Sequence, residues 1–267
     1  MENYIQVNKE LWNKKTATHI HSKFYDNENF LKGKNSLKSI ELDLLGDVKG
    51  KKILHLQCHF GQDTLSLGRM GAKATGVDLA DKAIEQAESL AQKLNLSDSV
   101  NFICCDINEL DQHLFEQFDI VFTSYGTIGW LPKIDKWAAI IQHFLKPNGQ
   151  FIFAEFHPVL WMLDDNFEKL AYPYFNTKTF HEEYTSSYTD GDGHEPTMGY
   201  SWNHPLSEVF GVLLKQNLII KDFQEYNSSP YNCFPNTVET KEGAYQIKGF
   251  EEKLPMVYSI IAEKNKR

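Results

Sequence analysis

The sequence predicts a doubly wound α/β fold built on a mostly parallel sheet. Between residues 52 and 156, apolar runs typical of buried strands alternate with stretches of helical periodicity. The first run, 53–56, passes through a polar turn holding Gly61 directly into a helical pattern. The second, 74–77, ends at the carboxylate of Asp78. Junctions of this kind bind ligands at the carboxyl edge of an open sheet, and a terminal acid suits a ribose, so we expect an adenosine-type cofactor.

The individual elements follow from periodicity and from the residues that end them. Gly71 closes the helix that starts near residue 63, and Ser36 is a possible N-cap for a helix over 36–42. We expect strands at 52–57, 74–78, 100–105, 118–124, 150–156, 218–226 and 256–262, and helices at 8–20, 36–42, 63–70, 81–94, 134–145 and 205–216.

The pattern changes after the fifth strand. Residues 157–203 are rich in aromatic residues and hold short alternating runs such as 178–184, which favours a folded lid or hairpin over a bare loop. The run 190–195 lacks the full spacing of a calcium loop and is interpreted as a solvated turn. We therefore expect an N-terminal helical cap (1–48), a cofactor-binding α/β core (49–156), a lid insertion (157–203) and the C-terminal part of the core (204–267).

Composition limits the classes of partner. The 267 residues are 42% hydrophobic and carry a net charge of −9, with no dense basic run, so we do not expect a nucleic-acid partner. The four cysteines form no C-x-x-C pair, which argues against a structural zinc site, and we predict no metal. His19 and His21 are too close in sequence to serve as two ligands on one helix face, and are expected at the surface.

The same features bear on localisation. The start of the chain has no signal-peptide pattern, and no apolar run is long enough to span a bilayer. Cysteines near strand ends behave as small apolar residues when reduced. We expect a cytoplasmic protein without a membrane partner, acting as a monomer or homodimer.

Five motifs, in order, resemble those of the class I S-adenosylmethionine-dependent methyltransferases. The resemblance spans about residues 51–156 and, with Trp202-Asn203-His204 downstream, favours a bacterial subgroup of the small-molecule type. It implies a Rossmann-like sheet of seven strands whose last strand, 256–262, runs antiparallel, and S-adenosyl-L-methionine as cofactor. The motifs are Ile53 to Leu65, Gly76-Val77-Asp78-Leu79, Cys105-Asp106-Ile107, Phe118-Asp119-Ile120-Val121 and Leu145 to Phe151.

The first motif departs from the family pattern. The family usually has an acidic residue where His55 stands and glycines where Gln57 and His59 stand, so only Gly61 of the three glycines remains. A dinucleotide needs backbone amides against its pyrophosphate, whereas S-adenosylmethionine has no phosphate and tolerates side chains that point away from it. The chain is accordingly a poor candidate for a nicotinamide-dependent oxidoreductase.

The resemblance also implies a set of cofactor contacts. Asp78 would accept the ribose hydroxyls, Leu79 and Ile107 would border the adenine, and Asp106 would accept from its amino group. The loop after the first strand would hold the methionine end, and residues after the fourth strand would line the sulfonium. The expected cofactor-binding residues are Trp12, His55, Gln57, Cys58, His59, Gly61, Asp63, Thr64, Asp78, Leu79, Cys105, Asp106, Ile107, Ser124, Tyr125 and Gly126.

The function implied is methyl transfer to an oxygen or nitrogen atom of a small molecule by in-line displacement. A general base is needed only if the nucleophile arrives protonated. Candidates for that base are His157, His204 and Tyr125, whereas Glu155 is expected to turn into the sheet. The altered glycine motif leaves an alternative open, a protein that binds S-adenosylmethionine or S-adenosylhomocysteine as a sensor or partner subunit without catalysing transfer.

Overall fold

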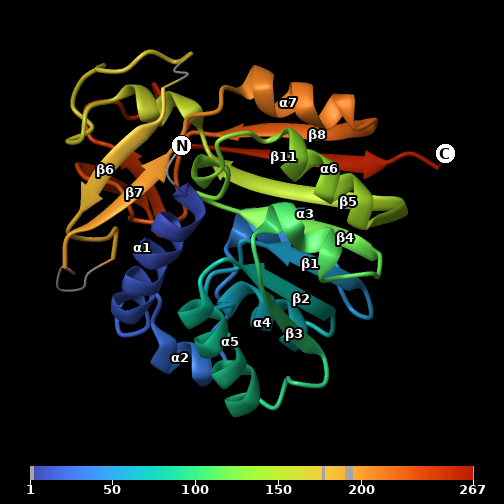
Figure 1. Cartoon of the computed structure of the whole chain (residues 1–267). Helices are drawn as coiled ribbons and strands as arrows, with labels where there is room; N and C mark the ends of the chain where they lie inside the picture. Colours follow the sequence, from blue (N-terminus) through green and yellow to red (C-terminus); the bar gives the residue numbers. More distant parts are fainter. Residues whose placement is uncertain (1–2, 176–177, 190–194, 267) are drawn as a thin grey trace.

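A seven-stranded sheet forms the centre of the protein, whose computed structural model describes residues 3–175, 178–189 and 195–266 (Figure 1). Its strand order is β3-β2-β1-β4-β5-β11-β8, and every neighbouring pair is parallel except those made by β11. The predicted fold, with an antiparallel last strand, is confirmed. The strands are β1 (Lys52–Leu56), β2 (Lys73–Asp78), β3 (Val100–Cys104), β4 (Phe118–Ser124), β5 (Leu145–Phe156), β8 (Leu218–Tyr226) and β11 (Val257–Lys264).

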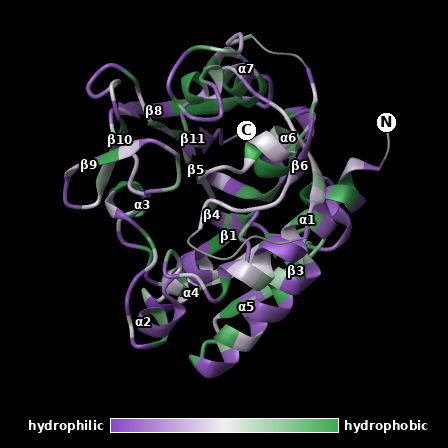
Figure 2. Ribbon diagram, turned by 90° about the vertical axis from the view of Figure 1, so that its left-hand side faces the viewer, coloured by the Kyte–Doolittle hydropathy of each residue, from purple (hydrophilic) through white to green (hydrophobic). Residues whose placement is uncertain are grey.

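Helices cover both faces of the sheet. One face packs against α4 (Gln62–Arg69) and α5 (Asp81–Lys93), and the opposite face packs against α6 (Asp135–Phe144) and α7 (Leu206–Lys215). In β1, Ile53 packs on the face covered by α4 and α5, whereas Leu54 and Leu56 pack on the face covered by α6 and α7. Because both of its faces are buried, the central strand β1 is mostly apolar, while α5 carries polar residues outward and apolar residues inward (Figure 2).

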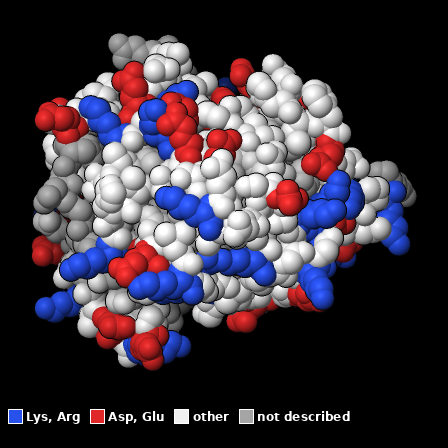
Figure 3. Space-filling view, turned by 90° about the horizontal axis from the view of Figure 1, so that it is seen from below, with Lys and Arg blue, Asp and Glu red and all other residues white. Residues whose placement is uncertain are grey.

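Charged side chains are mixed on the surface seen in Figure 3. On that face, Lys and Arg lie among Asp and Glu without separating into regions of one sign. None of the helices in the described parts of the chain has the length and apolarity that crossing a bilayer requires.

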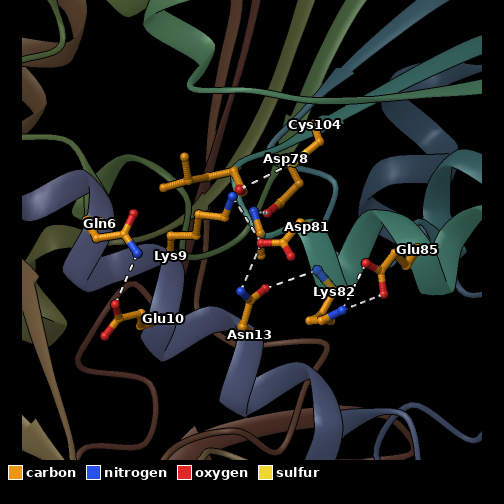
Figure 4. Close-up of polar contacts among 11 residues, drawn as sticks. Gln6, Lys9, Glu10, Asn13, Asp78, Asp81, Lys82, Glu85 and Cys104 are labelled. Carbon is orange, nitrogen blue, oxygen red and sulfur yellow. Dashed lines mark hydrogen bonds and ion pairs between the residues drawn. The ribbon is translucent and has the colours of Figure 1, made fainter.

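The N-terminal cap consists of α1 (Tyr4–His19), α2 (Asn27–Leu31) and α3 (Ser39–Leu45). Polar contacts fix α1 to the start of α5 (Figure 4): Lys9 Nζ lies 3.0 Å from Asp81 Oδ1, and Asn13 Nδ2 donates to the same oxygen at 3.0 Å. The backbone N–H of Lys82 donates to Asn13 Oδ1 at 3.1 Å. These contacts hold α1 across the carboxyl edge of β2.

Two expectations for the cap were wrong. The helix expected over 36–42 begins at Ser39, because the Ser36 hydroxyl instead lies 2.8 Å from Ser66 Oγ on α4 and is used to fix the two segments together. His19, expected at the surface, is fully buried, since the end of α1 turns it toward the loop after β1.

The segment after β5 folds over α1. Its strands β6 (Phe180–Tyr184) and β7 (Thr197–Ser201) pair antiparallel and lie beside α1 in Figure 1. Asn8 on α1 binds the backbone of Tyr200 twice, donating to its carbonyl at 3.0 Å and accepting from its N–H at 2.8 Å. Of the run 190–195, residues 190–194 lie outside the described residues.

Three shorter helices and a second hairpin complete the chain. No helix or strand was expected for 227–255, which contains β9 (Thr237–Lys241) and β10 (Ala244–Ile247). The 3-10 helices are η1 (Ile107–Gln112), η2 (Ile128–Trp130) and η3 (Pro158–Met162).

Candidate functional site

A cavity of about 570 Å³ opens at the carboxyl edge of the sheet, where the strand order reverses between β1 and β4. Most of the residues expected at the cofactor site line it, as does the candidate base His204. Two expected cofactor-binding residues, Thr64 and Cys105, do not line it, and neither does the candidate base His157. The predicted residues in its walls are Trp12, His55, Gln57, Cys58, His59, Gly61, Asp63, Asp78, Leu79, Asp106, Ile107, Ser124, Tyr125, Gly126 and His204.

The loop after β1 has the backbone of a glycine-rich loop despite its side chains. Gln57, His59 and Gly61 all have left-handed φ angles, of 55°, 51° and 78°. For a residue with a side chain this costs about 1–2 kcal/mol. At Gly61 a Cβ would lie 2.5 Å from the ring of Phe102, so only glycine fits there. The loop therefore adopts left-handed conformations that glycine takes most easily, with side chains present at two of the three positions.

The side chains that replace the two glycines bind other segments. Gln57 Nε2 donates to the carbonyl of Thr127 at 2.8 Å, which links the loops after β1 and β4. His59 Nε2 lies 2.8 Å from Nδ1 of His19, which links the same loop to α1. The second polar atoms of both side chains, Gln57 Oε1 and His59 Nδ1, are buried and have no hydrogen-bond partner among the described residues. Both residues line the cavity, so these atoms suit a polar ligand.

Asp78 ends β2 at the wall of the cavity. Its carboxylate accepts from the backbone N–H of His59 at 2.8 Å and from that of Ala80 at 2.9 Å. Burial raises the pKa of Asp78, and these two N–H donors oppose the rise. A carboxylate oxygen accepts more than one hydrogen bond, so Asp78 can hold the loop and still accept from a ligand hydroxyl.

His55 takes the place of the family's acid but carries no charge. Its side chain is 3% exposed, and its Nδ1 lies 2.8 Å from Thr64 Oγ1. Burial lowers the pKa of His55 to about 3, so the ring is neutral at pH 7. Because Thr64 turns toward this ring, it does not reach the cavity.

Glu155 on β5 holds the loop after β4, contrary to the expectation that it turns into the sheet. Its carboxylate accepts from the backbone N–H groups of Gly126, Thr127 (2.8 Å) and Phe156 (2.7 Å). Burial raises the pKa of Glu155, and these donors oppose the rise. Glu155 lines the cavity and positions the loop in which Tyr125 and Gly126 lie.

The three candidate bases are already bound by other groups. The Tyr125 hydroxyl donates to Glu41 Oε2 at 3.0 Å, and burial with the nearby Glu41 charge raises its pKa well above the usual value. His204 faces an acceptor at each nitrogen, Glu208 Oε2 at 3.1 Å and the Leu131 carbonyl at 2.8 Å. The Tyr125 hydroxyl keeps its proton at neutral pH, and both ring nitrogens of His204 are engaged, so neither side chain is placed to take a proton from a substrate.

His157 lies away from the cavity, so its assignment as a candidate base is not supported. Its Nδ1 accepts from the backbone N–H of Val159 at 3.2 Å, and its Nε2 lies 3.0 Å from Glu225 Oε1 on β8. Strand alternation at the end of β5 turns it toward the neighbouring strands.

Among the described residues, no group of three or more potential metal ligands gathers.

The cavity also has walls that were not predicted. On α1 a stripe at helical spacing faces it, formed by Tyr4, Asn8, Trp12 and Lys15. That spacing was visible in the sequence and could have identified the stripe. Residues Tyr231, Cys233, Phe234 and Pro235 between β8 and β9 form another wall. Nothing local in the sequence indicates that this segment reaches the site.

Known proteins resemble this chain in sequence and in fold. An uncharacterised protein of Haemophilus influenzae is 31% identical over 145 residues, covering 51% of this chain and 57% of that protein. The ubiquinone biosynthesis O-methyltransferase of Coxiella burnetii is 30% identical over 118 residues, covering 44% of this chain and 48% of the enzyme. The chain thus spans about half the length of these curated relatives.

Among solved structures, an S-adenosylmethionine-dependent methyltransferase of Mesorhizobium loti has the same fold, with a TM-score of 0.61 at 17% sequence identity. The alignment covers 88% of this chain and all of that one. Residues 47–198 match the methyltransferase domain family, and this stretch holds all five motifs and most of the cavity-lining residues of the core. The chain therefore belongs to the class I S-adenosylmethionine-dependent methyltransferases.

Proposed function

We propose that this methyltransferase transfers a methyl group from S-adenosylmethionine to an oxygen or nitrogen atom of a small organic acceptor. One observation carries the proposal: a single cavity runs from Asp78 and Asp106 at the sheet edge to aromatic side chains of α1, the lid and the 231–235 segment. The aromatic walls are Trp12, Phe24, Tyr25, Trp130, Phe156, Trp161, Tyr184, Tyr188, Trp202, Tyr231 and Phe234. Walls of this kind suit a small organic molecule rather than a polymer.

The described residues fit the proposed cofactor. Asp78 has the acceptor capacity for two ribose hydroxyls, and Leu79 with Ile107 provides apolar sides for an adenine ring. The unpaired Gln57 Oε1 suits the ammonium of the methionine end, a role that the neutral His55 cannot take. Asp106, whose carboxylate also caps η1 through the Asn108 N–H at 2.9 Å, would accept from the adenine amino group.

The chemistry asks for alignment more than for a catalytic base. S-adenosylmethionine, when bound, supplies a methyl group on a cationic sulfur, which the acceptor atom displaces in line. The loops after β1 and β4, joined by Gln57 and held by Glu155, fix the position of both partners. The cap and the lid exclude water from the reaction. Because Tyr125 and His204 are both engaged, the acceptor atom would arrive already deprotonated, or keep its proton until the methylated product is released to solvent.

Two measurements test this function. Calorimetric titration with S-adenosylmethionine and S-adenosylhomocysteine should give binding of both at one site per chain. With a labelled methyl group, the label should appear in small metabolites of a cell lysate. Incorporation into RNA or protein instead would contradict the small-molecule acceptor, and binding without any transfer would contradict catalysis.

A further inference from the structure

Lys15 is a buried ammonium that faces the cavity, and no described residue supplies it with a counterion. The residue is 4% exposed and lines the cavity from α1. Its Nζ lies 5.1 Å from the ring centre of Trp12, 5.2 Å from that of Trp130 and 4.7 Å from that of Tyr184. Among the described residues, no carboxylate or hydrogen-bond acceptor pairs with it. Three aromatic faces stabilise the charge, but they do not replace a counterion.

The unpaired ammonium of Lys15 suits an anionic group supplied by a ligand. Burial of an unpaired charge is costly unless an opposite charge completes the pair. Burial lowers the pKa of Lys15 to about 8, so the ammonium form still dominates at pH 7. The sulfonium of the cofactor is itself cationic and would be repelled by this group. An anion close to Lys15 removes both penalties at once.

The position of Lys15 indicates that its anionic partner belongs to the methyl acceptor and not to the methionine carboxylate of the cofactor. Its cage joins α1 to Trp130, which follows β4, and to Tyr184 on the lid strand β6. Another lysine of the cavity wall, Lys38, acts on Asp63 in the first turn of α4, where the methionine end would lie. Lys38 would therefore be available to the cofactor carboxylate, whereas Lys15 faces the lid side.

The surrounding charges limit the anion to a single negative charge. Four carboxylates line the same cavity, those of Asp63, Asp78, Asp106 and Glu155. The lining also holds Lys34 and Lys38, so its four carboxylates outnumber its three lysines. This excess of negative charge opposes a phosphate dianion more strongly than a monoanion, which one ammonium balances. The remaining walls are aromatic, which suits a largely apolar body.

We propose that Lys15 is the anion-binding residue of the acceptor pocket, and that the methyl acceptor is an organic monocarboxylate with a largely apolar body. The inference rests on the proposed methyl transfer and adds the chemical class of the acceptor. The carboxylate would sit beside the ammonium within the cage of Trp12, Trp130 and Tyr184.

The first test separates acceptors by charge and needs no variant. A small-molecule extract of the cells that make the protein is divided on an anion-exchange resin, and both fractions are offered with methyl-labelled S-adenosylmethionine. We expect label only in compounds from the retained fraction. Treating the extract with phosphatase before the separation should not change this result. Label in compounds of the flow-through would overturn the monocarboxylate inference while leaving the proposed methyl transfer intact. The same conclusion would follow if phosphatase treatment moved the acceptor from the retained fraction to the flow-through. Absence of label from both fractions would overturn the proposed function with it.

The second test assigns the anion to Lys15. Lys15→Met keeps the length of the side chain inside its aromatic cage and removes the charge. We expect transfer from dilute retained fraction to fall about tenfold or more, while affinity for S-adenosylhomocysteine stays within about twofold. Lys14→Met, at the exposed neighbouring lysine, is the matched control and should leave both unchanged. If affinity for S-adenosylhomocysteine fell as much as transfer, Lys15 would bind the cofactor carboxylate instead of the acceptor. Unchanged transfer would show that Lys15 does not bind the acceptor.

Discussion

The Tyr125 hydroxyl donates a hydrogen bond to Glu41 Oε2 across 3.0 Å, between residues 84 positions apart in the chain. Glu41 lies on α3 and is fully buried, and its Oε1 lies 3.5 Å from the hydroxyl of Tyr231. One carboxyl group thus joins the N-terminal cap, the loop after β4 and the segment after β8. These are three of the segments that enclose the cavity.

Glu41→Gln should make the protein more resistant to alkaline pH. Burial, with the nearby charge of Asp63, raises the pKa of Glu41 to about 7 from its model-peptide value of 4.5. Between these values the native state keeps a proton that the unfolded state has lost, so native stability falls as pH rises. Glutamine does not titrate, so the variant does not lose stability in this way. Its free energy of unfolding relative to wild type should therefore rise by about 1–3 kcal/mol from pH 5 to pH 8.

Urea denaturation at several pH values measures this difference. Glu88→Gln, at an exposed position of α5, is the matched control. Parallel stability curves for wild type and Glu41→Gln would mean that Glu41 titrates alike in the folded and unfolded chains.

Asp78→Ala should weaken binding of S-adenosylhomocysteine by about 1–3 kcal/mol, the scale of charge-assisted hydrogen bonds to a ligand. Asp78 also holds the N–H groups of His59 and Ala80, so the variant should lose some thermal stability. Calorimetry measures the affinity, with Asp98→Ala as an exposed control. Unchanged affinity would exclude Asp78 as the ribose acceptor.

His55 should make the native state sensitive to acid. Its pKa is about 3 in the fold and about 6.5 in the unfolded chain, so below pH 6.5 only the unfolded state takes up the proton. Stability is lost as pH falls through this window, by roughly 1.4 kcal/mol per pH unit. In His55→Asn, which retains polar atoms for Thr64, this part of the slope should disappear between pH 6.5 and pH 5.

Denaturation of both proteins at these pH values provides the measurement. His113→Asn changes an exposed histidine in the same way and serves as the control. An identical slope in wild type and His55→Asn would show that His55 is protonated in the native protein.

Two glycine substitutions should differ in cost. Gly126 has a φ of 69°, and a Cβ there meets no atom closer than 3.8 Å, so Gly126→Ala should cost only the backbone strain of about 1–2 kcal/mol. Gly61→Ala adds overlap with Phe102 at 2.5 Å and should cost about 2–5 kcal/mol in all. Urea denaturation compares the two. Equal costs would mean that Phe102 moves aside freely.

The fold was predictable because its determinants are local. β4 and β8 have the expected bounds, and the ends of α5 and α7 differ from expectation by at most one residue. β4, α5 and α7 bury regular patterns of side chains, which a sequence displays directly. Where a side chain found a distant partner, local reasoning was wrong, as for Ser36, which contacts Ser66 instead of capping a helix.

The sequence alone determined the strand–loop–helix junction, the acid at Asp78 and the order of the motifs, since these depend on spacing along a few consecutive residues. Only the tertiary structure decided that Lys15 is buried with no counterion among the residues described, that Glu41 holds two tyrosines and that His19 is buried against His59. Such contacts join segments tens of residues apart. They arise when helices and loops pack around the sheet, and this packing sets the burial on which the charges and pKa values of the site depend.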